Sequence, residues 1–282
     1  MEIQWPLVFY SLLTGLGAGA FAFVAVTELL GKVERLRMPG ALTALAAIAA
    51  GGIASAFHLG HVERVFNVLT NLSSGIALEL ILTGLTGLAV LAYIVTVRLG
   101  YSARAKKSIA AIGLVLAVVL AFAIGASYVL PGRPAWNTWL LPILYLASAA
   151  VLGLFTMYIW TVVLKESEAT APVVNRATLI ALVVQAAVVA AYVAYLAMAP
   201  FPNPSRSADR LLSGDLAAVF WGGLVVVGLV IPLGLTVWFL AAKRRAVPSL
   251  AVAVVGLACV LGGGVAIRAL MYILGSSIEQ FA

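Results

Sequence analysis

Eight long apolar runs divide the sequence, and they constrain what the chain can fold into more than any other feature. Each run approaches or exceeds the roughly 20 residues that a helix needs to cross about 30 Å of hydrocarbon. No segment alternates like the strand of a barrel, so each run is predicted to be a helix that satisfies its own backbone polar groups. The predicted spans cover residues 5–30, 39–58, 76–97, 108–130, 138–164, 175–199, 215–241 and 248–275.

The composition leaves no room for a separate soluble domain. Hydrophobic residues make up 64% of the 282 residues and charged residues 10%, whereas soluble domains carry about 25% charged residues. The first run has no basic segment before it and is too long for the apolar part of a signal peptide. We therefore expect an all-α integral membrane protein, a bundle of eight transmembrane helices in one domain over residues 1–282.

The positive charges indicate the orientation of the bundle. The net charge is +7, but the basic residues cluster in short connections, where they act as topology signals and do not point to nucleic acid. Twelve of the 17 lie in the first, third, fifth and seventh connections, which are therefore predicted to be cytoplasmic, with both termini outside. These twelve are Lys32, Arg35, Arg37, Arg98, Arg104, Lys106, Lys107, Lys165, Arg176, Lys243, Arg244 and Arg245. Trp5, Tyr128, Trp136 and Trp139 are expected at the outer interface, where aromatic rings concentrate.

The connection between spans two and three is amphipathic and too polar to cross the membrane. Its apolar residues recur at helical spacing, so a short interfacial helix is predicted to lie along the outer surface. These residues are Val62, Val65, Phe66, Leu69 and Leu72.

Ionisable residues gather at the same outer side. His58 and His61 are one turn apart, and a neutral imidazole can accept a proton or donate a hydrogen bond, as quinol oxidation requires. Glu79 lies shallowly in span three, and a carboxylate in a span commonly marks a proton or substrate path. Arg268, near the outer end of span eight, is expected to extend toward the interface, to pair with Glu79, or to hydrogen-bond a quinone carbonyl.

No redox metal centre is predicted on this chain. A single cysteine, Cys259, lies in an apolar run, so neither a disulfide framework nor a thiolate-held cluster can be built. His58 and His61 are too close together to bind opposite faces of a haem.

The remaining polar and small residues of the spans are expected to be structural. Glu28 and Asp215 have no obvious partner in the sequence and lie near helix ends. Glycines such as Gly19 and Gly52 are expected to allow close helix packing, as bundles in lipid require.

Three short motifs resemble the membrane-anchor subunit of dimethyl sulfoxide reductase. They are His58-Leu59-Gly60, Arg64-Val65-Phe66-Asn67 and Ser73-Ser74-Gly75 leading to Glu79. The eight-span layout and Arg268 with Tyr272 are also similar to that family. The chain departs from the family pattern at His61-Val62-Glu63, where a small residue and a proline are usual, and at Val65, where alanine is usual.

The resemblance implies an anchor that docks an iron–sulfur subunit and a molybdopterin subunit and oxidises menaquinol near the outer face. It would lie in the cytoplasmic (inner) membrane of a prokaryote and bind no haem, metal or iron–sulfur cluster itself. His58 and Glu79 match the catalytic quinol-site residues of the family. With them, His61, Arg64 and Arg268 form the expected quinol-binding set.

Three other interpretations remain open. The chain could be the anchor of a related quinone-reactive complex with another substrate, or a structural anchor whose quinol pocket has degenerated. A transporter would place ionisable groups near the midplane and often show repeated halves, whereas here the charges gather at one surface.

Overall fold

The computed structural model describes residues 2–57, 74–165, 170–199, 202–241 and 249–275. Within these ranges the chain is helical, without a strand, and eight helical segments are long and apolar enough to cross a membrane. The spans are α1 (Trp5–Leu30), α2 (Glu34–Ala56), α3 (Gly75–Arg98), α4 (Ala103–Ala126), α5 (Leu140–Val163), α6 (Thr170–Met198), η2 (Ala218–Val230) continuing into α8 (Ile231–Ala241), and α9 (Leu250–Leu274). The prediction of eight spans is confirmed.

Serine side chains define the start of three spans. The hydroxyls of Ser74, Ser102 and Ser249 accept hydrogen bonds from the backbone N–H three residues later, which satisfies a donor that a helix start leaves unpaired. α1 ends at Leu30, and the next residue, Gly31, adopts the left-handed conformation, which commonly terminates helices. Local capping thus sets boundaries that hydropathy places only approximately.

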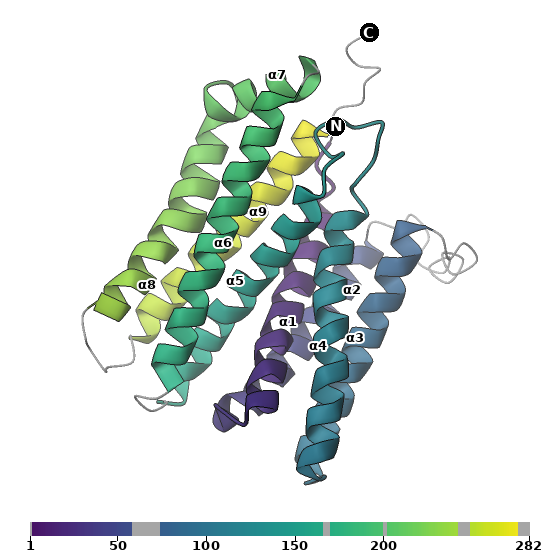
Figure 1. Cartoon of the computed structure of the whole chain (residues 1–282), viewed down its shortest axis with the longest axis vertical. Coiled ribbons are helices and arrows are strands. Elements are labelled where there is room, and N and C mark those ends of the chain that lie inside the picture. Colours follow the sequence, from purple (N-terminus) through teal and green to yellow (C-terminus); the bar gives the residue numbers. More distant parts are fainter. Residues whose placement is uncertain (1, 58–73, 166–169, 200–201, 242–248, 276–282) are drawn as a thin grey trace.

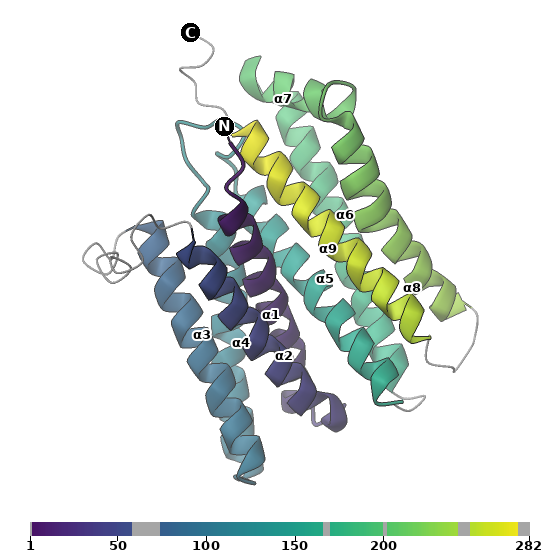
Figure 2. The same ribbon diagram turned by 180° about the vertical axis from the view of Figure 1, so that it is seen from behind.

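The spans form two groups joined by α5 (Figures 1 and 2). α1 packs against α2, α4 and α5, whereas α5 also contacts α6 and α9. α1 and α5 are the most buried spans among those described. α1 begins and α9 ends at the same end of the bundle (Figure 1), which we name the outer end because the charge distribution predicts that it faces outside.

Glycines allow α1 and α5 to approach closely. A Cβ on Gly19 would collide with the backbone of Ala149, and one on Gly153 with the backbone of Gly19. The packing role expected for Gly19 is confirmed. Gly52 is different, because no described atom lies within 4 Å of the Cβ it would carry. Within the described part of the chain, Gly52 therefore has no packing contact of this kind.

A short helix that the sequence analysis did not predict lies between spans six and seven. α7 (Pro202–Leu212) is found at the outer end (Figure 1), with Ala208 and Leu211 buried and Asp209 exposed. It is too short and polar to register as an apolar run.

The interfacial helix predicted between spans two and three falls within residues 58–73, outside the described residues.

An ion pair joins α7 to the start of the next span. Nε and Nη2 of Arg210 donate to the Asp215 carboxylate at 2.8 and 2.7 Å. These hydrogen bonds lower the pKa of Asp215 below its ordinary value. Asp215 therefore has a partner that the sequence did not reveal.

Candidate functional site

A cavity of about 570 Å³ lies at the outer end of the bundle. Its volume is within the usual range of small-molecule sites, roughly 300–1,000 Å³. The walls come from α1, α2, α3, α9 and the connection after α4. The lining residues are Gln4, Leu7, Tyr10, Gly52, Ser55, Ala56, Ser74, Gly75, Ile76, Glu79, Leu80, Thr83, Ser127, Tyr128, Leu130, Arg133, Trp136 and Tyr272.

Glu79 is the only carboxylate among these lining residues. Ser74 caps the start of α3 and thereby places Glu79 little more than one turn inside the helix, as shallowly as predicted. Its carboxyl group interacts with the hydroxyls of Tyr10 and Ser127, and the Tyr10 hydroxyl lies 3.1 Å from Oγ1 of Thr83. A carboxyl group held among hydroxyls at a cavity wall can exchange protons with a bound molecule.

An aromatic cluster forms another part of the lining. The hydroxyls of Tyr128 and Tyr272 are 2.7 Å apart, and the rings of Tyr128 and Trp136 meet edge to face. The pKa of Tyr128 is raised well above its ordinary value, chiefly because the side chain is buried and also because Tyr145 and Tyr272 lie nearby. Tyr128 therefore remains protonated at neutral pH, and its ring and those of Trp136 and Tyr272 give this part of the cavity an aromatic wall.

Trp136 and Arg133 attach the connection between α4 and α5 to the end of α9. The indole Nε1 of Trp136 donates to the carbonyl of Met271 at 2.8 Å, and Arg133 donates to the carbonyl of Gly275. The Arg133 guanidinium also lies 4.7 Å from the centre of the Trp136 ring.

The aromatic residues predicted at the outer interface differ in what they contact. Trp5 and Trp139 are exposed, but Trp136 is buried, and both Trp136 and Tyr128 line the cavity. Sequence reasoning missed these two and Arg133 as site residues. The only available signal was an arginine and aromatic residues close together in a Pro-containing connection.

The structure contradicts two of the three expectations for Arg268, extension to the interface and pairing with Glu79. The Arg268 side chain is buried, 1% exposed, so it does not extend to the interface. Nε donates to Ser11 Oγ at 2.9 Å, Nη1 to the Gly264 carbonyl at 2.9 Å and to Ser148 Oγ at 3.3 Å, and Nη2 to the Ser11 carbonyl at 3.2 Å.

Arg268 also does not pair with Glu79. In the described part of the chain, no carboxylate lies within ion-pair distance of its guanidinium, and Arg268 is not among the residues that line the cavity. Hydroxyl and carbonyl groups of α1 and α5 satisfy the guanidinium, because those two helices pack against α9 at this depth.

The other predicted site residues, His58, His61 and Arg64, lie outside the described residues. The last residues of α2 that the cavity touches are Ser55 and Ala56. His58 follows Ala56 by two positions in the sequence.

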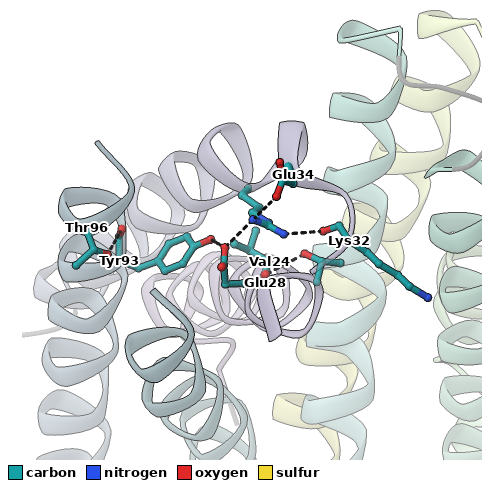
Figure 3. Close-up of polar contacts among 8 residues, drawn as sticks. Val24, Glu28, Lys32, Glu34, Tyr93 and Thr96 are labelled. Atoms are coloured by element: carbon teal, nitrogen blue, oxygen red, sulfur yellow. Dashed lines mark hydrogen bonds and ion pairs between the residues drawn. The ribbon is translucent and has the colours of Figure 1, made fainter. Parts of the chain in front are cut away.

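A second polar cluster, drawn in Figure 3, lies at the opposite end of the bundle, where α1 ends and α2 begins. Arg37 Nη1 is 3.0 Å from Glu28 Oε2, and the Tyr93 hydroxyl donates to the same oxygen at 2.8 Å. Arg37 also contacts Glu34 and the carbonyl of Lys32. Glu28, for which the sequence suggested no partner, therefore joins α1, α2 and α3.

Metal ligands do not converge in the described ranges. No three His, Cys, Asp or Glu side chains come together there in a way that could hold a metal ion. The residues that line the cavity can exchange protons and contact a ring.

Comparison with known proteins identifies the family. A search of curated proteins gave no match. The family model described as "Polysulphide reductase, NrfD" matches residues 1–272, nearly the whole chain. The chain thus belongs to the polysulphide reductase NrfD family, whose members are quinone-interacting membrane subunits of molybdopterin oxidoreductase complexes.

Proposed function

We propose that the chain is the quinol-oxidising membrane subunit of a dimethyl sulfoxide reductase-type complex and that menaquinol reacts in the outer-end cavity. The observation that carries the proposal is the position of Glu79, a carboxyl group in the wall of a cavity large enough for a ring. Family membership supports an interaction with quinone. The motifs from His58 to Glu79 favour the dimethyl sulfoxide reductase branch and menaquinol.

In the proposed reaction, quinol is oxidised to quinone with the loss of two protons and two electrons. Glu79 accepts one hydroxyl proton, and His58 accepts the other. Both protons then leave to the outer side. The electrons pass to an iron–sulfur cluster on a partner subunit and from there to a molybdopterin subunit, where the terminal substrate is reduced.

The side chains of the cavity have distinct roles in this proposal. Tyr10 and Ser127 hold the Glu79 carboxyl group by hydrogen bonding, and the aromatic residues contact the faces and edges of the quinol ring. His61 and Arg64 follow His58 on the same outer connection and are proposed to complete the binding site. The chain would lie in the cytoplasmic membrane of a prokaryote with both termini outside.

The experiment uses the complex purified with its partner subunits. Menadiol is mixed rapidly with it, and reduction of the partner's iron–sulfur cluster is followed by absorbance. Glu79→Gln should slow this step by about 100-fold or more, the usual contribution of a general base. Electron donation from reduced benzyl viologen directly to the molybdopterin subunit should be unchanged.

The matched control is Glu34→Gln, because the Glu34 side chain is exposed and lies at the far end of the bundle. It should oxidise menadiol at the wild-type rate. His58→Gln tests the second proton acceptor in the same assay. Wild-type menadiol oxidation by Glu79→Gln would show that the cavity is not the reaction site.

A further inference from the structure

Arg268 carries a charge that its surroundings do not neutralise. A guanidinium remains protonated in proteins, and a charge within a membrane span is costly and usually paired. Four hydrogen bonds satisfy most of its N–H groups, but all four acceptors are uncharged hydroxyls and carbonyls. Its positive field therefore extends into the neighbouring part of the bundle.

Tyrosine rings connect Arg268 to the cavity. The guanidinium carbon lies 4.9 Å from the centre of the Tyr145 ring, and that ring lies 5.8 Å from the Tyr128 ring, which lines the cavity. These two distances place the charge within about 11 Å of the Tyr128 ring. Tyr272, another lining residue, is one turn further along α9.

On the helices that pack against Arg268, no other permanent charge lies near it; a second guanidinium, that of Arg133, lies on the connection after α4 and lines the cavity itself. Those helices are α1, α5, η2 and α8. Residues 218–241 contain no titratable side chain, α5 contains only Tyr145 and Tyr158, and α1 only Tyr10 and Glu28. Glu28 follows Ser11 by 17 residues, about 25 Å along the helix, and is paired with Arg37. α9 itself adds Cys259 and Tyr272.

We infer that Arg268 is an electrostatic positioning residue, which favours anionic forms of the groups and the quinol in the cavity without contacting the quinol. The inference rests on the proposed function. When a quinol hydroxyl transfers its proton to Glu79, the quinolate oxygen keeps the electron pair of the O–H bond. The field of Arg268 stabilises that anion until its two electrons pass to the partner's iron–sulfur cluster.

The size of the effect follows from the distance. For a quinol seated against the Tyr128 ring, the charge is on the order of 11 Å away. At an effective dielectric constant of about 20, a unit charge at that distance shifts an acid–base equilibrium by about one pH unit. Arg268 favours the deprotonated form, so its removal should move the rising, acidic limb of the pH profile toward higher pH. A residue with only a packing role would lower the rate without moving that limb.

The test measures kcat/KM for menadiol oxidation by the intact complex as a function of pH. Arg268→Met should move the acidic limb up by about one unit, and Arg268→Lys, which keeps the charge, should leave it within a few tenths of a unit. Ser148→Asp gives an independent test if Arg268→Met does not accumulate, because it neutralises Arg268 in place. It should cause a similar upward shift, whereas its uncharged counterpart Ser148→Asn should not.

The outcomes separate this inference from the proposed function. An unchanged acidic limb in Arg268→Met, or in Ser148→Asp where the methionine variant does not accumulate, overturns the role of Arg268, even if Glu79→Gln blocks quinol oxidation. Equal shifts in the lysine and methionine variants also overturn it, because charge would then not be the cause. If Glu79→Gln oxidises menadiol normally, the proposed site itself is wrong.

Discussion

Replacement of Glu28 by glutamine would leave the Arg37 guanidinium buried without the carboxylate that neutralises it. The two side chains are 4% and 11% exposed, and their closest atoms are 3.0 Å apart. Removing one member of a buried ion pair typically costs about 3–5 kcal/mol, since the remaining charge is not rehydrated. Arg37 keeps its contacts with exposed Glu34 and the Lys32 carbonyl, so we expect about 3 kcal/mol.

Two further variants separate charge from hydrogen bonding. Tyr93→Phe removes only the hydroxyl that donates to Glu28, and interhelical hydrogen bonds in membranes are worth about 0.6 kcal/mol on average. We therefore expect a loss of about 1 kcal/mol at most. The double variant Glu28→Leu/Arg37→Met removes both charges and should be more stable than Glu28→Gln, because apolar replacement of a buried pair is often neutral.

The assay is reversible unfolding of the purified chain in mixed micelles of a mild and a denaturing detergent, followed by tryptophan fluorescence. Glu34→Gln is the control, because the Glu34 side chain is 77% exposed. Exposed pairs contribute about 0–1 kcal/mol. A Glu28→Gln variant as stable as Glu34→Gln would refute the reasoning, and so would a double variant less stable than Glu28→Gln.

Two more predictions concern glycines. Gly52→Leu projects a side chain into the cavity without displacing a described atom, so menadiol oxidation should slow at least about tenfold while the thermal midpoint changes little. Gly84→Leu, also in open space but away from the cavity, is its control, and equal rates in the two would contradict cavity binding. Gly19→Val would force a side chain against the Ala149 backbone and should cost about 3 kcal/mol in the same unfolding assay, at the upper end of overpacking effects; wild-type stability would contradict the close contact of α1 with α5.

The sequence predicted the spans well where their limits depend on hydrophobicity. Span one was predicted at 5–30 and is found at Trp5–Leu30. The predicted helix limits were wrong where charged or aromatic residues at the edge of an apolar run make contacts with other parts of the chain. α2 begins at Glu34 instead of 39, because Arg37 of its first turns forms an ion pair with Glu28 of α1. α4 ends at Ala126 instead of 130, because Tyr128 leaves the helix to line the cavity.

The candidate site was predicted only in part. Glu79 could be identified because a carboxylate near the start of a span stands out in any apolar run. Tyr10, Tyr128, Trp136 and Tyr272 could not, because tyrosine and tryptophan are common at membrane interfaces whether or not they face a cavity. Only the packing of the connection after α4 against the end of α9 distinguishes them.

The sequence by itself determined the number of spans and supplied the prediction of which end faces outside. Those properties depend on the thickness of the membrane and on the local distribution of charge, which a single segment carries. The tertiary structure decided which polar groups meet, because this depends on the rotation and depth of each helix against its neighbours. Arg268 illustrates the difference: its sequence position suggests the surface, whereas packing against α1 and α5 buries it among serine hydroxyls and backbone carbonyls.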